Sequence, residues 1–245
     1  MEKEPRLKVN RLFTKSSQDP YKGINWVKRN CEIRDPDGKL IFQMDNVIVP
    51  DFWSQISTDI ISQKYFRKSG VTSGGKKKGA ENDSREVFHR LALAWQRWGE
   101  REGLFDSQED GEAFYDEIRY MLVHQMAAPN SPQWFNTGLY EAYDLKGPAQ
   151  GHYYVDPSNQ KVEKSTSAYE RPQPHACFIM NVEDDLVNKG GIMDLLTREA
   201  RLFKYGSGTG SNFSNIRAKD EALSGGGVSS GLLSFLKVLD RSASA

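Results

Sequence analysis

The C-terminal part of the chain alternates between strand-like and helix-like stretches, and this order restricts the fold more than any other feature. An apolar run predicts a strand over residues 177–182, and the apolar spacing after it predicts a helix over residues 192–205. A glycine-rich turn, a second strand-like piece at residues 212–216 and an apolar helix over residues 232–239 follow. Strands that alternate with helices are typical of α/β architecture. The sequence therefore predicts an α/β domain over residues 176–245.

The upstream residues predict a module of strands and short helices. Residues 1–66 contain two strand-like stretches around a Pro-Asp-Gly turn, followed by a short helix. The apolar face of that helix is predicted to be formed by Trp53, Ile56, Ile60 and Ile61. Residues 67–82 are rich in glycine, serine and lysine and predict a flexible linker, because such residues bury little surface against the entropy of ordering. The alternative is that their lysine run contacts a polyanion.

Residues 83–138 predict a helical region. Asp83 or Ser84 is placed to cap a first helix, and the apolar positions predict a second helix over residues 111–127. Trp95 and Trp98 belong either to the core of this region or to a surface that stacks on a base. Residues 139–175 are rich in glycine, proline, tyrosine and serine. They predict a long, partly irregular connection, a kind of segment that is often functional or inserted.

Composition excludes some classes of function. The 33 basic and 33 acidic residues balance, which argues against a dedicated nucleic-acid or membrane-surface binder, since both need a basic excess. No stretch approaches the ~20 apolar residues that span a bilayer, and the charged first residues do not resemble a secretory signal. The two cysteines, Cys31 and Cys177, cannot form a multi-disulfide framework or alone complete a zinc site. We therefore expect no metal site from these residues and a reducing cytoplasm.

Three segments contain residues that could bind a ligand or take part in a reaction. The segment KYGSGTGSNFSNIR has glycines and hydroxyls that could bind an anion, although it matches neither standard nucleotide fingerprint; the alternative is a tight turn. The segment AAPNSPQWFNTGL places polar side chains between restricting prolines, which suits substrate positioning or a capped turn equally. In PHACFIMNV, Cys177 begins a strand, and strand ends hold ligands in α/β folds. A buried, inert cysteine is the alternative there.

Together these segments resemble class II ribonucleotide reductases, which depend on adenosylcobalamin. The resemblance runs along most of the chain and includes the leading module. Its motifs are NSPQWFNTGL (130–139), ACFIMNVEDDL (176–186), FKYGSGTGSNFSNIR (203–217) and LSGGGVSSGLLSFLKVLDR (223–241). The fold that it implies is α/β: an N-terminal β-rich and helical module, followed by the incomplete first part of the family's ten-stranded α/β barrel.

The resemblance also implies roles for named residues. Cys177 matches one cysteine of the pair that supplies reducing equivalents and ends as a disulfide, with its partner beyond Ala245. Ser131, Ala176 and Gly208, together with Cys177, match positions that contact the substrate. Asp184 and Arg217 align with residues near the deoxynucleotide effector. Cys31 matches no functional cysteine and is expected to be structural.

The implied reaction reduces ribonucleotides to 2′-deoxyribonucleotides for DNA synthesis, with adenosylcobalamin as cofactor. Its implied partners are a thioredoxin-like dithiol reductant, a deoxynucleotide effector and, at full length, a second copy in a homodimer. The family's N-x-C-x-E element is absent, so the chain alone is expected to be inactive, and no residue is assigned to cobalamin. The alternatives are a diiron-type reductase of the same superfamily and a non-catalytic nucleotide-binding or regulatory protein.

Overall fold

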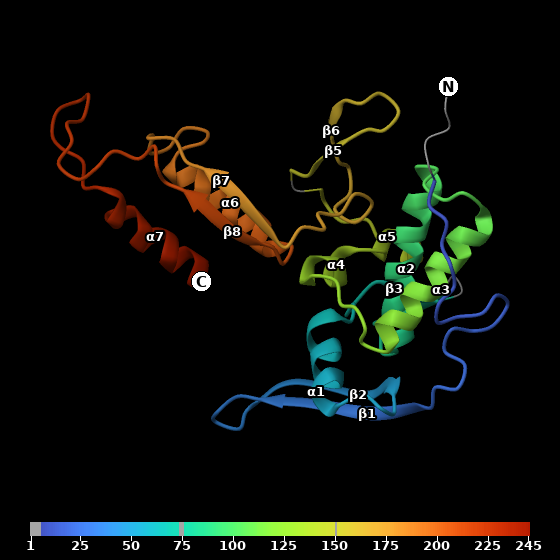
Figure 1. The fold of residues 1–245 in the computed structure, drawn as a ribbon. Helices are drawn as coiled ribbons and strands as arrows, with labels where there is room; N and C mark the ends of the chain where they lie inside the picture. Colours follow the sequence, from blue (N-terminus) through green and yellow to red (C-terminus); the bar gives the residue numbers. More distant parts are fainter. Residues whose placement is uncertain (1–5, 74–75, 150) are drawn as a thin grey trace. The chain divides into compact units, whose positions relative to one another are not determined.

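The computed structural model describes residues 6–73, 76–149 and 151–245 (Figure 1). The chain divides into two compact units, Met1–Pro174 and His175–Ala245, here called unit 1 and unit 2. Each unit has its own hydrophobic cluster. The architecture is mixed α/β, with the longer helices of unit 1 beside antiparallel hairpins and with parallel strands in unit 2.

Unit 1 consists of antiparallel hairpins and helices. Strands β1 with β2, β3 with β4, and β5 with β6 form three separate two-stranded sheets. A π-helix, η1, directly continues α1. In chain order the elements are β1 (Trp26–Arg34), β2 (Leu40–Pro50), α1 (Gln55–Ile60), η1 (Ile61–Tyr65), β3 (Val71–Ser73), β4 (Lys76–Gly79), α2 (Ser84–Arg101), α3 (Gln108–Val123), α4 (Ser131–Asn136), α5 (Leu139–Tyr143), β5 (Tyr153–Val155) and β6 (Val162–Lys164).

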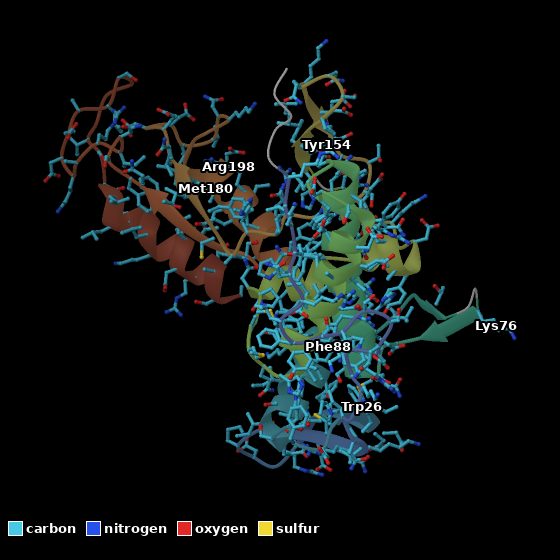
Figure 2. All side chains as sticks on the ribbon, turned by 45° about the vertical axis from the view of Figure 1, so that its right-hand side comes forward. Trp26, Lys76, Phe88, Tyr154, Met180 and Arg198 are labelled. Carbon is cyan, nitrogen blue, oxygen red and sulfur yellow. The ribbon has the colours of Figure 1, made fainter. Side chains whose placement is uncertain are left out.

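The core of unit 1 lies between hairpin β1–β2, the α1–η1 segment, and helices α2 and α3. Val47 and Val49 alternate inward along β2, and Phe88 on α2 is fully buried beside them (Figure 2). The indole of Trp53 donates to the carbonyl oxygen of Val123 at 2.8 Å, which joins the end of α3 to this core. The inward residues of β2, spaced two apart, and the apolar residues of α2, at helical spacing, therefore form one hydrophobic cluster.

The helices of the predicted helical region are confirmed, with changed limits. Asp83 caps α2 through a capping box with Glu86, as expected from the sequence. The second helix, α3, begins three residues earlier than predicted, because Ser107 forms its own capping box with Asp110. Trp95 packs against the core cluster, in line with the core interpretation.

One expectation for unit 1 was wrong, and two segments contain more regular structure than the sequence predicted. Ile56 and Ile60 are 70% and 47% exposed, because the buried face of this short segment is formed by Thr58 and Ile61. Ile61 already belongs to the π-helix, whose wider turn changes which residues share a face. The linker at residues 67–82 contains the β3–β4 hairpin, although residues 74 and 75 lie outside the described part. The connection at residues 139–175 contains helix α5 and the β5–β6 hairpin.

Unit 2 is a strand–helix–strand unit followed by a helix. Strand β7 (Cys177–Asn181) pairs in parallel with β8 (Gly208–Asn212), and helix α6 (Ile192–Lys204) connects them. Helix α7 (Leu232–Ser244) completes the unit. Figure 2 shows Met180 of β7 beside α6, in the cluster that also includes residues of α7. The predicted α/β order is confirmed, and α7 extends beyond the predicted end.

The second strand of unit 2 does not begin where the sequence predicted it. We expected residues 206–210 to turn and residues 212–216 to form the strand, but the glycine-rich segment is itself strand β8. The turn is completed earlier, at Gly206, whose φ of 83° suits glycine. Its N–H donates to Phe203, and the N–H of Ser207 donates to Leu202, which closes α6 with a Schellman motif.

Candidate functional site

Cys177 is the first residue of β7, and its thiol is exposed. Its partner in the parallel register is Gly208, and the next outward pair is Ile179 with Gly210. Residues that alternate with these, such as Met180, face the helices, so the thiol lies on the opposite face from α6. The face around Cys177 is thus open, because glycines stand where β8 would otherwise present side chains.

Glycine at position 208 leaves room directly beside the thiol. A Cβ atom at this position would lie 3.4 Å from Sγ of Cys177, which is van der Waals contact, so a side chain here would occupy the space beside the thiol. The N–H of Gly208 donates to the carbonyl oxygen of Ala176 at 2.6 Å. Gly208 therefore contributes space rather than a free donor in this arrangement.

The hydroxyls that the sequence suggested as anion donors have partners within the chain. Ser207 donates to the carbonyl oxygen of His175 at 2.8 Å. Thr209 and Ser211 donate to the same carboxylate oxygen of Glu199 on α6, at 3.1 and 3.3 Å. In this arrangement these hydroxyls donate within the chain, and the bonds from Thr209 and Ser211 fasten β8 to the helix.

Glu199 is a residue that sequence reasoning missed. By binding hydroxyls two residues apart, it fixes which face of β8 turns toward α6, and this leaves Gly208 and Gly210 on the face of the thiol. The strict alternation of glycine with a hydroxyl residue over 208–211 was the available signal. This alternation is easily overlooked as a strand pattern, because glycine-rich segments are usually assigned to turns.

The two ends of the parallel pair differ in chemistry. Cys177 lies at the amino end, so the rule that places ligands at carboxyl ends of strands does not itself support this thiol. Beyond the carboxyl ends, Arg217 Nε donates to Asp184 Oδ2 at 2.5 Å, and another guanidinium nitrogen donates to the carbonyl oxygen of Ala222. The two residues predicted to lie near an effector are thus brought together.

Ser131 and its neighbours belong to unit 1. Asn130 caps α4 by accepting from the N–H of Gln133, so the capped-turn interpretation holds for this segment, and Ser131 is the first helical residue. Its hydroxyl lies 3.3 Å from that of Tyr65. Because Cys177 and Gly208 lie in unit 2, the predicted site residues fall into two groups that are described separately.

The second cysteine has the opposite environment. Cys31 is fully buried in β1, and its thiol contacts the carbonyl oxygen of Asp59 at 4.0 Å. The pKa of the Cys31 thiol is raised to about 12, mainly because the thiol is buried and to a smaller extent because Asp59 lies beside it. Such a thiol stays protonated and inert at neutral pH. This environment agrees with the structural role that the sequence suggested.

Two comparisons with known proteins bear on the family. Residues 27–125 match the family described as class II vitamin B12-dependent ribonucleotide reductase, and residues 175–245 match the ribonucleotide reductase barrel domain. A vitamin B12-dependent ribonucleotide reductase of Bradyrhizobium diazoefficiens is 54% identical over 98% of this chain, and one of Agrobacterium fabrum is 52% identical over the same share.

The chain belongs to the vitamin B12-dependent ribonucleotide reductase family. It spans 21% of the length of these two relatives. The barrel match begins at His175, which is also the first residue of unit 2, so the parallel pair β7–β8 is a partial barrel sheet. A ribonucleoside-diphosphate reductase large subunit of vaccinia virus is 33% identical over 45% of the chain and 14% of that protein.

The described residues do not form a recognisable cobalamin site. No cluster of three or more His, Cys, Asp or Glu side chains that could hold a metal ion occurs among them. The apolar cavity between α1, η1 and α4 has a volume of about 220 Å³. Two more polar and more open hollows have volumes of about 650 and 510 Å³; the first is lined by parts of α2 and α5, the second by parts of residues 11–21 and of α3. None of the three contains a feature specific to a corrin ring. No residue of the chain is therefore assigned to this cofactor.

Within the described ranges, no helix is long and apolar enough to cross a membrane.

Proposed function

We propose that this chain provides part of the active site of an adenosylcobalamin-dependent ribonucleotide reductase, with Cys177 as one of two reducing thiols. The observation that supports this is the exposed thiol of Cys177 opposite Gly208, on the face of the sheet that the helices leave open. A thiol that must reach both a sugar and a second cysteine needs such an open face, since a disulfide requires Cα atoms within about 7 Å.

The proposed step balances as follows. The C2′–O bond of the ribonucleotide breaks and a C2′–H bond forms, while the oxygen leaves as water. Two thiols, Cys177 and a cysteine outside this chain, lose two electrons in total and become a disulfide. Adenosylcobalamin would supply the radical that starts the reaction, and the described residues contribute access and position. A thioredoxin-like dithiol would then restore the two thiols.

Ser131, Ala176 and Gly208 are proposed to contact the substrate. Ser131 offers a hydroxyl and Gly208 offers room beside the thiol, whereas the carbonyl oxygen of Ala176 accepts from Gly208 within the chain. In the proposed complex, Ala176 therefore stabilises the start of β8 and lies next to the reacting thiol.

Asp184 and Arg217 are proposed to bind the deoxynucleotide effector. Their ion pair beyond the carboxyl ends of β7 and β8 supports this, because that edge is where α/β sheets bind ligands. The carboxylate is an acceptor for a sugar hydroxyl, and the guanidinium suits a phosphate. A homodimer at full length and a cytoplasmic location are part of the same proposal, and the two free cysteines are compatible with a reducing compartment.

The test uses the full-length enzyme with Cys177→Ser. Turnover driven by a dithiol should fall by at least about a thousandfold, because one of the two electron donors is lost, and effector binding should stay within twofold. Cys31→Ser is the matched control and should leave turnover unchanged. Turnover that survives Cys177→Ser would contradict the catalytic role and favour a binding or regulatory protein. Restoration of the apoenzyme by adenosylcobalamin rather than by iron would exclude the diiron alternative.

A further inference from the structure

The hydroxyl of Ser131 has a specific neighbour, the hydroxyl of Tyr65. The two oxygens are 3.3 Å apart, although the residues are 66 positions apart in sequence. Tyr65 ends the π-helix η1, and Ser131 begins α4. The Tyr65 ring stacks on Trp134 at 5.3 Å between centroids, with 23° between the planes. The tyrosine is therefore held against α4 by its ring as well as by its hydroxyl.

A buried arginine fixes the backbone on both sides of this pair. Arg90 of α2 is fully inaccessible, and one terminal nitrogen donates to the carbonyl oxygens of Tyr65 at 3.1 Å and Trp134 at 2.8 Å. Its other terminal nitrogen donates to the carbonyl oxygen of Thr137 at 2.8 Å. Since the guanidinium is planar and rigid, it holds η1 and α4 in one fixed relation.

The arginine is itself held by a buried carboxylate. Glu81, also fully inaccessible, accepts from Nε of Arg90 at 2.8 Å and from the hydroxyl of Tyr143 at 2.7 Å. Its second oxygen accepts from the N–H of Arg67 at 2.7 Å. A buried charge without partners is costly, so this network persists as a unit. It gives Tyr65 and Ser131 a rigid common support.

We infer that Tyr65 is a positioning residue that orients the hydroxyl of Ser131 toward a bound ribonucleotide. When the tyrosine hydroxyl donates to Oγ of Ser131, the O–H of the serine is left to donate to an oxygen of the substrate. This inference rests on the proposed function, since it takes the substrate contact of Ser131 from there. The rigid support explains how a short six-residue helix holds that hydroxyl in one direction.

The test is a double-mutant cycle in the full-length enzyme. Tyr65→Phe keeps the ring stacked on Trp134 and removes only the hydroxyl. It should raise KM for the ribonucleotide roughly two- to tenfold, the range for one neutral hydrogen bond, and leave kcat unchanged. Ser131→Ala should raise KM at least as much. The double variant should be no worse than Ser131→Ala alone, because the tyrosine acts only through the serine. Tyr153→Phe, at an exposed tyrosine of β5, is the matched control.

The outcomes separate the two claims. If Ser131→Ala raises KM and Tyr65→Phe either has no effect or adds its full effect to that of Ser131→Ala, the positioning role is wrong and the proposed substrate contact stands. If Ser131→Ala leaves KM unchanged, the substrate contact itself fails. Hydrogen exchange of α2 and α4 in each variant checks that unit 1 remains folded, because both helices belong to that unit.

Discussion

Unit 1 and unit 2 differ in how completely each buries its own side chains. In unit 1, Phe88, Leu91 and even the Glu81–Arg90 ion pair are inaccessible. In unit 2, Ile179 in the middle of β7 is 88% exposed, although parallel sheets are usually covered on both faces. Unit 1 therefore buries its core within its own residues. In unit 2 one face of the β7–β8 sheet packs against helices, and the other face, here called the presented face, is exposed. The thiol of Cys177 lies on the presented face.

The largest expected effect tests the buried network of unit 1. Arg90→Ala should lower the free energy of unfolding of unit 1 by about 3–5 kcal/mol, because Glu81 would remain buried without its charge partner. Urea unfolding followed by tryptophan fluorescence measures this loss. Arg101→Ala, at an exposed position of the same helix, should stay within about 0.5 kcal/mol. Equal effects of the two variants would contradict the account of a buried clamp.

A matched pair of leucines compares the two cores directly. Leu91 on α2 and Leu195 on α6 are both fully buried, and leucine-to-alanine changes in cores cost about 2–5 kcal/mol. Leu91→Ala should fall near the upper end, because fully buried residues surround it. Leu195→Ala should fall near the lower end, because most of its neighbours are only partly buried and can relax. Hydrogen exchange of α2 and α6 measures both, and the reverse order would break the comparison.

Helix capping gives a smaller difference between the units. Asp83 caps α2 through a capping box, while α6 begins after Gly191 with no side-chain cap. Asp83→Ala should therefore destabilise unit 1 by about 1 kcal/mol. Thermal unfolding monitored by tryptophan fluorescence gives the value, and Asp83→Asn should restore most of it. No change on Asp83→Ala would show that packing alone sets the start of α2.

The smallest expected effect concerns the surface of unit 2. Arg217→Gln breaks the pair with Asp184, whose side chains are each about one-third exposed. The stability of unit 2 should fall by less than about 1 kcal/mol, since solvent screens such pairs, and the loss should shrink as salt is added. Hydrogen exchange of α6 and α7 at low and high salt provides the measurement. A loss above 2 kcal/mol would mean that the pair is structural and not available to an effector.

The sequence predicted the elements better than it predicted what the side chains of the site do. The strand at residue 177, the helix after it and the cap at Asp83 follow from local periodicity and capping, and the structure has all three. Strand β8 was misplaced, because its pairing with β7, about 30 residues earlier, cannot be derived from local sequence, and the alternation of glycine with hydroxyl residues was assigned to a turn. The support of Ser131 by Tyr65 and Arg90 was missed for the same reason.

We propose that the thiol of Cys177, on the open face of unit 2, gives up electrons during catalysis, and an experiment on the full-length enzyme tests this. A single turnover without external dithiol, quenched with an alkylating agent and mapped by peptide mass, reports the state of each cysteine. We expect Cys177 to become disulfide-bonded in proportion to the deoxyribonucleotide formed, while Cys31 remains a thiol. Product formed with Cys177 still alkylatable in full would contradict it.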